Sequence, residues 1–318
     1  MTRMIALALV LLLAAMAVSA VASWISRRKP QRALGTGPAS AASSKHAEDR
    51  AMLAAQIRAV AALVFAIVMF LTLLRASIGL TGQVGLPLAL TAGLSASGGL
   101  LLFSALPAAK APGSHRLPSQ KPATIGAGPA GSAPTARMLA SRWSFALPIV
   151  VLLAYAALIV AAGLTSSPDE LGRHRVLRLV SADASSAATP YPGWFYGVPL
   201  LVVAVLLTGS AFLAFVRISR NPSLPNPGMA ALDSRWRRVA IQVLLRITTG
   251  ILLGYLGGTA IVAGRAMAAL SSLHGWGIAT VVVGAALALT GVVLLVLAAR
   301  SALGIRAAVR RGNRPPAA

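Results

Sequence analysis

The chain has 318 residues, of which 57% are hydrophobic and only 11% are charged, and its mean hydropathy is +0.78. Soluble domains carry about 25% charged residues, so this composition excludes an ordinary soluble protein. Cysteine is absent, which excludes disulfides, thiolate catalysis and cysteine metal sites.

Apolar runs near the length that crosses a bilayer recur along the chain, and they predict an all-α, polytopic transmembrane bundle of about seven spans. The first run covers residues 4–24. It is open to two interpretations: a cleaved signal peptide, with Val18-Ser19-Ala20 as the cleavage pattern, or a retained span. The basic cluster Arg27-Arg28-Lys29 directly after the run favours a retained span, since such clusters stay in the cytoplasm.

Six further spans are expected at residues 59–74, 86–106, 145–164, 197–216, 239–264 and 278–299. The span at 86–106 is the least hydrophobic of these. Its small residues recur at three- and four-residue spacing, which lets a neighbouring helix approach closely; they are Ala92, Ser95, Ala96 and Gly99. Residues 107–141 are rich in Pro, Gly, Ala and Ser and contain no acidic residue, so we expect a disordered cytoplasmic linker.

The basic residues that give the chain its net charge of +23 are unevenly distributed between the two sides of the membrane. Of the 29 basic residues, 22 fall in the long connectors and the tail that the seven spans place on one side, and only six fall on the other. The positive-inside rule therefore predicts an extracytoplasmic N-terminus and a cytoplasmic C-terminus. Because the positive charge follows the connectors, we do not expect nucleic acid as a partner.

Residues 165–196 form the predicted extracytoplasmic loop, which holds three of the six acidic residues. Its charged residues are candidates for ligand or partner contact: Asp169, Glu170, Arg173 and Arg175. The alternative is structural, a helix start at SPDELG with Ser167 as its cap. Residues 175–180 are compatible with a short strand or an interfacial helix. The run PYPGWFYG is typical of an interfacial aromatic anchor with a turn at Pro192-Gly193.

Catalytic patterns are scarce. No predicted span has Asp, Glu or His in its interior, and neither a phosphate-binding glycine loop nor HExxH occurs. The four histidines are scattered singly, so no metal site is expected. The sequence therefore predicts no catalytic residue, no cofactor and no enzymatic activity.

Arg246 is the one ionisable residue predicted inside a span. It belongs to a stripe at four-residue spacing, made of Arg238, Gln242, Arg246, Gly250, Gly254 and Gly258. Either Arg246 extends towards the interface while the glycines receive a neighbouring helix, or it contacts an anion or a lipid phosphate. Both interpretations stay open at this point.

From SSPDELGRHRVLRLV through TPYPGWFYGVPLLV to DSRWRRVA, the chain resembles a group of multi-pass membrane proteins from GC-rich actinobacteria that have no assigned activity. The resemblance implies a bacterial membrane protein and transfers no site residue. We expect a multi-pass protein of the bacterial cytoplasmic membrane, in contact with the lipid bilayer and an envelope protein. The predicted role is a non-enzymatic structural or accessory component; the alternative is a permease or carrier subunit.

Overall fold

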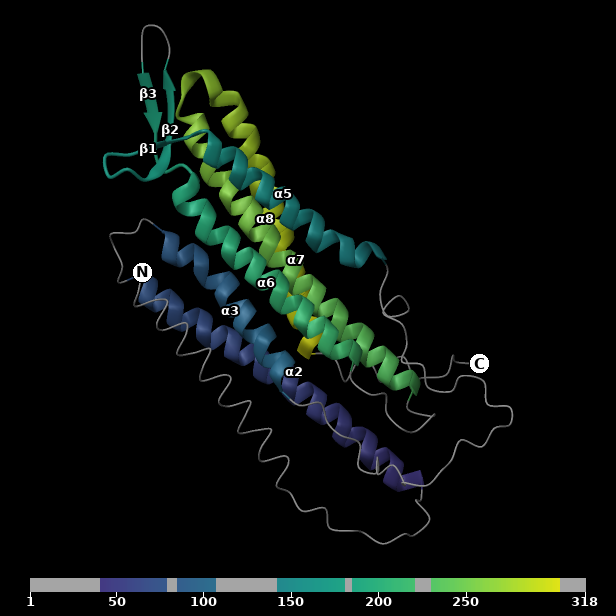
Figure 1. Ribbon diagram of the computed structural model, residues 1–318. Coiled ribbons are helices and arrows are strands. Elements are labelled where there is room, and N and C mark those ends of the chain that lie inside the picture. The colour runs from purple at the N-terminus through teal and green to yellow at the C-terminus, as the bar shows by residue number, and fades with distance from the viewer. Residues whose placement is uncertain (1–40, 79–84, 107–141, 181–184, 221–229, 304–318) are drawn as a thin grey trace.

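The computed structural model describes residues 41–78, 85–106, 142–180, 185–220 and 230–303. Six long helices account for most of these residues, and one small sheet lies between two of the helices in the chain (Figure 1). The helices are α2 (Ala41–Ile78), α3 (Leu86–Ala105), α5 (Arg142–Leu164), α6 (Trp194–Arg220), α7 (Ala230–Ala268) and α8 (His274–Leu303). The predicted span at residues 4–24 and the predicted linker at 107–141 lie outside the described residues.

Each of the six helices contains a stretch long and apolar enough to cross a membrane. These stretches are Ile57–Ser77, Leu86–Ala105, Ala146–Leu164, Trp194–Ser219, Trp236–Ala268 and Ser271–Ala302. They confirm a multi-pass helical membrane protein and match the six spans predicted after residue 58. Several are longer than predicted, because the helices continue past the apolar residues; α7, with 39 residues, is about 58 Å long at 1.5 Å per residue.

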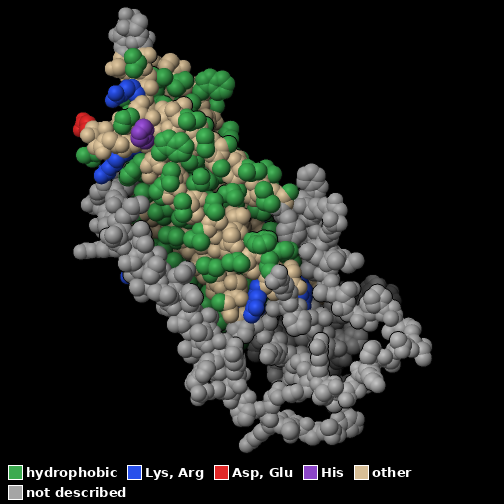
Figure 2. Space-filling model, in the orientation of Figure 1, with side chains coloured by type: hydrophobic (Ala, Val, Ile, Leu, Met, Phe, Trp, Pro, Cys, Tyr) green, Lys and Arg blue, Asp and Glu red, His purple; other side chains and the backbone are tan. Residues whose placement is uncertain are grey.

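Successive helices alternate in direction, so their ends gather at two opposite ends of the bundle (Figure 1). We call these the sheet end and the basic end. The basic end collects the described cations Arg58, Arg217, Arg237, Arg238 and Arg300. Asp169 and Glu170 lie at the sheet end, where Figure 2 shows acidic, basic and histidine side chains together. The described charged residues are therefore distributed between the two ends of the bundle as the charge count along the sequence predicts.

Helices α7 and α8 form the most extensive helix pair in the described bundle. Glycines seven residues apart on each helix face one another, so the two backbones are in direct contact. A Cβ added at Gly257 would lie 2.4 Å from the Gly284 carbonyl oxygen, and one at Gly291 would lie 2.5 Å from the Gly250 carbonyl oxygen. The three facing pairs, here called the glycine seam, are Gly250 with Gly291, Gly257 with Gly284, and Gly264 with Gly277.

The glycine seam corrects one interpretation of the sequence. The stripe at four-residue spacing was expected to receive a neighbouring helix through Gly250, Gly254 and Gly258. Only Gly250 does so; at Gly254 and Gly258 an added Cβ would meet nothing within 4 Å. The contact follows a period of seven because two helices that cross at a small angle meet once every two turns.

The other described helices assemble around this pair. Helices α5 and α6 pack on α7, α3 packs on α6, and α2 packs on α3. The core contains Tyr155, Leu207 and Leu252, each fully buried. The expected close approach at α3 is confirmed, since a Cβ on Gly99 would lie 2.9 Å from the Ala66 side chain of α2.

A three-stranded antiparallel sheet follows α5. Its strands are β1 (Ser166–Pro168), β2 (His174–Val180) and β3 (Ser185–Ala188), in the order β1-β2-β3. The inward residue Leu177 is buried in a small cluster with Ala263 and Ala266 of α7, so the sheet uses the end of the bundle as its core. The helix start expected at SPDELG is wrong: Ser167 lies in β1, and the acidic residues occupy the following turn.

Gly257 and Gly258 provide a matched test of the glycine seam. We expect Gly257→Ala to destabilise the protein by about 1–3 kcal/mol, because the added methyl would collide with backbone atoms of α8 that cannot move aside. Gly258→Ala should be neutral or slightly stabilising, since the space is open and alanine favours helix. Thermal unfolding of both variants in the same detergent measures the difference. Equal melting temperatures would contradict the role given to the seam.

Candidate functional site

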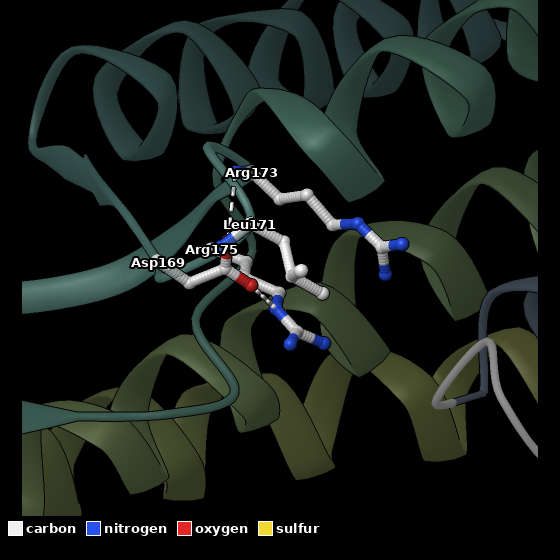
Figure 3. Close-up of polar contacts among 4 residues, drawn as sticks. All are labelled: Asp169, Leu171, Arg173 and Arg175. Carbon is white, nitrogen blue, oxygen red and sulfur yellow. Dashed lines mark hydrogen bonds and ion pairs between the residues drawn. The ribbon is translucent and has the colours of Figure 1, made fainter.

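The turn between β1 and β2 is built on the side chain of Asp169 (Figure 3). Its Oδ1 accepts hydrogen bonds from the backbone N–H of Leu171, at 2.9 Å, and of Arg173, at 2.8 Å. Gly172 has a φ of 70°, a left-handed conformation that favours glycine. The carboxylate therefore satisfies the donors of a tight turn instead of those of a helix, which is why SPDELG mimics a helix start in sequence.

The second carboxylate oxygen of Asp169 pairs with Arg175 of β2, at 2.5 Å from Nε. Desolvation by itself raises the pKa of the Asp169 carboxyl, but the hydrogen bonds from two backbone N–H groups and from Arg175 outweigh it. The pKa of Asp169 is therefore lowered, and the same hydrogen bond raises the pKa of Arg175. The Arg175 guanidinium also lies beside the hydroxyl of Tyr196, which is buried and makes no hydrogen bond to the described residues.

The structure brings together the four loop residues that the sequence singled out. Asp169 and Arg175 interact with each other, whereas Glu170 is exposed on the turn. The Arg173 guanidinium lies 5.3 Å from the centre of the Phe195 ring, as a cation–π contact. Two of the candidates therefore hold the turn, and Glu170 is the one whose side chain is presented to the outside.

The aromatic turn packs against the sheet and α5. Tyr191 is 6% exposed, and its hydroxyl is hydrogen-bonded to Thr165 at 2.7 Å. The Trp194 ring lies against Gly163 of α5, where a Cβ would be 2.4 Å from it. At Gly193 a Cβ would lie 2.3 Å from the His174 carbonyl oxygen. These residues join the sheet to α5 and α6, while Trp194 stays partly exposed, and the interfacial anchor stays a prediction.

Arg246 lies far from the loop, in the half of α7 nearer the basic end. It is partly buried, and its guanidinium donates to the Ser301 hydroxyl of α8 at 2.9 Å. No carboxylate in the described part of the chain forms an ion pair with it. Arg246 thus connects the two helices of the central pair just beyond the end of the glycine seam.

Two other arginines at the basic end serve as helix caps. Arg58 is 5% exposed; its guanidinium donates to the Phe103 carbonyl oxygen in the last turn of α3 and lies 4.3 Å from the centre of the Phe103 ring. Arg237 donates to the Ile218 carbonyl oxygen near the end of α6, at 2.9 Å. The C-terminus of a helix carries only about half a negative charge, so the contact of Arg58 satisfies donors without neutralising its guanidinium.

A groove runs along the described bundle between the α2–α3 pair and the α7–α8 pair. It has two neighbouring chambers, of about 370 Å³ at the basic end and about 570 Å³ at the sheet end. They share a set of lining residues at mid-height: Phe70, Ala92, Ile251 and Leu295. The Gly254 and Gly258 face of α7 lines the larger chamber. There the Tyr255 hydroxyl accepts a hydrogen bond from the Gly93 N–H of α3, at 2.8 Å.

The groove is what sequence reasoning missed. The signal for it was present in the glycines of α7 that do not belong to the seven-residue repeat. In the part of the chain that the structure describes, no group of three histidine or acidic side chains is placed to hold a metal ion. Comparisons with protein-family models, with curated proteins and with solved structures find no match.

Asp169 can be tested by the pair Asp169→Asn and Asp169→Ala. The amide oxygen of asparagine can still accept from the two backbone N–H groups, whereas alanine leaves them without an acceptor. We expect hydrogen exchange of residues 166–180 to accelerate strongly in Asp169→Ala and less in Asp169→Asn. Glu170→Gln, at the exposed neighbour, is the control and should exchange like the parent protein. Equal exchange in all three variants would show that the turn does not depend on Asp169.

The same turn should respond to acid. Because the pKa of Asp169 is lowered in the folded loop, its stabilising effect is complete above the unfolded pKa of about 3.9 and is lost as the pH falls through the lower folded pKa. Hydrogen exchange of residues 166–180, corrected for the intrinsic exchange rate, should therefore lose protection as the pH falls below about 4. Asp169→Asn should show no such pH dependence. A protection factor that stays constant over this range in the parent protein would overturn the assignment.

Proposed function

We propose that this integral membrane protein is a non-enzymatic accessory component of a bacterial cytoplasmic membrane that presents its small sheet to an envelope protein partner. The observation that carries the proposal is the turn at Asp169, whose polar groups are satisfied internally while Glu170 and Leu171 project from it. Leu171 is 68% exposed, and a rigid exposed turn loses little conformational entropy when a partner binds.

The surface around the turn has the composition of a partner-binding surface. At the turn, the exposed charge of Glu170 lies next to the exposed apolar side chain of Leu171. At the other end of β2, Arg178 and Val180 are also exposed, Val180 to 78%. Interfaces pair an apolar centre with a polar rim, and the sheet provides both kinds of side chain at each end of β2. The described spans contain no Asp or Glu, which supports a structural role over an ion-coupled one.

A permease or carrier subunit is the second candidate from the sequence. Both chambers of the groove have predominantly apolar walls, so they offer a hydrophilic substrate few hydrogen-bonding partners. The groove therefore favours the accessory role over transport of a polar solute. The source in a GC-rich actinobacterium stays a prediction from the resemblance of the sequence.

Membrane orientation can be tested without background, because the chain has no cysteine. We expect Glu170→Cys, at the sheet end, to react with a membrane-impermeant maleimide on intact cells. Arg300→Cys, which is exposed at the basic end, should react only after the cells are permeabilised, because the positive-inside rule places that end in the cytoplasm. The reverse labelling pattern would overturn the orientation.

The partner surface can be tested by a photo-crosslinking amino acid introduced at Leu171. We expect one dominant crosslinked envelope protein in intact cells. The same probe at Val283, which is 57% exposed on α8, controls for contacts within the membrane and should not crosslink that protein. Combining the Leu171 probe with Asp169→Ala should abolish the product, because the turn is lost. Crosslinks to lipid alone, or identical products from both positions, would contradict the accessory role.

A further inference from the structure

The chamber of the groove at the basic end has the dimensions of one lipid leaflet. Along α2 its lining runs from Ala59 to Phe70, a distance of about 16 Å at 1.5 Å per residue. The hydrocarbon core of a bilayer is about 30 Å thick, so this is about the depth of one leaflet. The chamber ends near the middle of the bundle, where the second chamber begins.

The walls of this chamber suit a hydrocarbon chain. They are formed by small residues and by larger apolar ones, among them Ala62, Gly99, Ala240, Ile247 and Ala299. A methylene group is about the size of a water molecule, about 30 Å³, so 370 Å³ holds about twelve methylene groups. The volume therefore fits one acyl chain.

The outer end of the chamber carries an indole N–H and a guanidinium. Trp236 lines it, and its indole Nε1–H is buried and makes no hydrogen bond to the described residues. Arg58 lies at the same end, with its guanidinium over the ring of Phe103, another lining residue. Among the described contacts, the acceptor of the Arg58 guanidinium is the neutral Phe103 carbonyl oxygen, so this end presents one indole donor and one guanidinium to an anionic group.

We propose that this chamber binds one acyl chain of an anionic phospholipid from the leaflet at the basic end. The headgroup phosphate lies beside Arg58, where it compensates the charge of the guanidinium. The Trp236 Nε1–H donates to an ester or phosphate oxygen, and the acyl chain extends along Ala62 and Ala240 towards the middle of the membrane. Basic sites between transmembrane helices on the cytoplasmic side bind anionic headgroups by the same chemistry. This site is independent of the partner proposed for the sheet end.

The first test is lipid retention by the full chain purified in mild detergent, measured by native mass spectrometry with added phosphatidylglycerol or phosphatidylcholine. We expect one phosphatidylglycerol per chain, retained about tenfold more tightly than phosphatidylcholine, as a charge-assisted contact implies. Ala240→Phe should abolish retention, because the larger side chain fills the chamber. Val283→Phe, on the outer face of α8, is the matched control and should retain the lipid. Equal retention of the two lipids, retention by Ala240→Phe, or a chain that is dimeric and free of lipid would overturn the proposal.

The second test separates the headgroup contacts from folding. Trp236→Phe keeps the ring and removes only the Nε1–H donor, so it should weaken phosphatidylglycerol binding about threefold to tenfold. Arg58→Gln should remove most of the preference for phosphatidylglycerol over phosphatidylcholine, and Arg300→Gln, at an exposed site on the same end, should keep it. Unchanged affinity in Trp236→Phe together with an unchanged lipid preference in folded Arg58→Gln would overturn the assignment of the headgroup site.

Discussion

The backbone contact between α7 and α8 is the interaction on which the rest of the described structure depends. In a membrane, helices gain nothing by expelling water from between them, so close van der Waals packing has to supply the association. The glycine seam allows that packing over three successive levels, at Gly250, Gly257 and Gly264. Helix α7, which the seam fixes, also contacts other parts of the protein: Tyr255 reaches α3, while Ala263 and Ala266 support the sheet.

Glycine has two opposite uses on the same helix. At seven-residue spacing, on the side facing α8, its missing side chain permits backbone contact. At Gly254 and Gly258 it leaves space on the side facing α3. Since α3 and α2 approach the central pair chiefly through α6, nothing from the described helices fills that space. The groove therefore follows from the same residue type that makes the central pair rigid, placed at a different interval.

The sequence predicted what depends on composition along a single segment, namely the six described spans, their grouping by charge and the close packing of Gly99. It did not predict features that depend on which segments meet. SPDELG carries the residues of a helix start, but pairing of Ser167 with Val176 makes it a strand and a turn. Tyr191 belongs to a run that is typical of an interfacial anchor, but its burial depends on the sheet that packs against it. The glycines of the seam recur every seven residues in the sequence. Gly250 also belongs to the four-residue spacing through Arg246, and the prediction followed that shorter spacing.

The two ends of the bundle handle charge in different ways, and this difference bears on what each end binds. At the sheet end, Asp169 neutralises Arg175 within the protein, so the charge of Arg175 needs no partner from outside. At the basic end, the described acceptors of Arg58 and Arg246 are a carbonyl oxygen and a hydroxyl. Neutral acceptors satisfy hydrogen bonds but leave the positive charge in place. A buried guanidinium such as Arg58 is costly unless an anion compensates it, and the anionic headgroup proposed for the groove would supply that compensation.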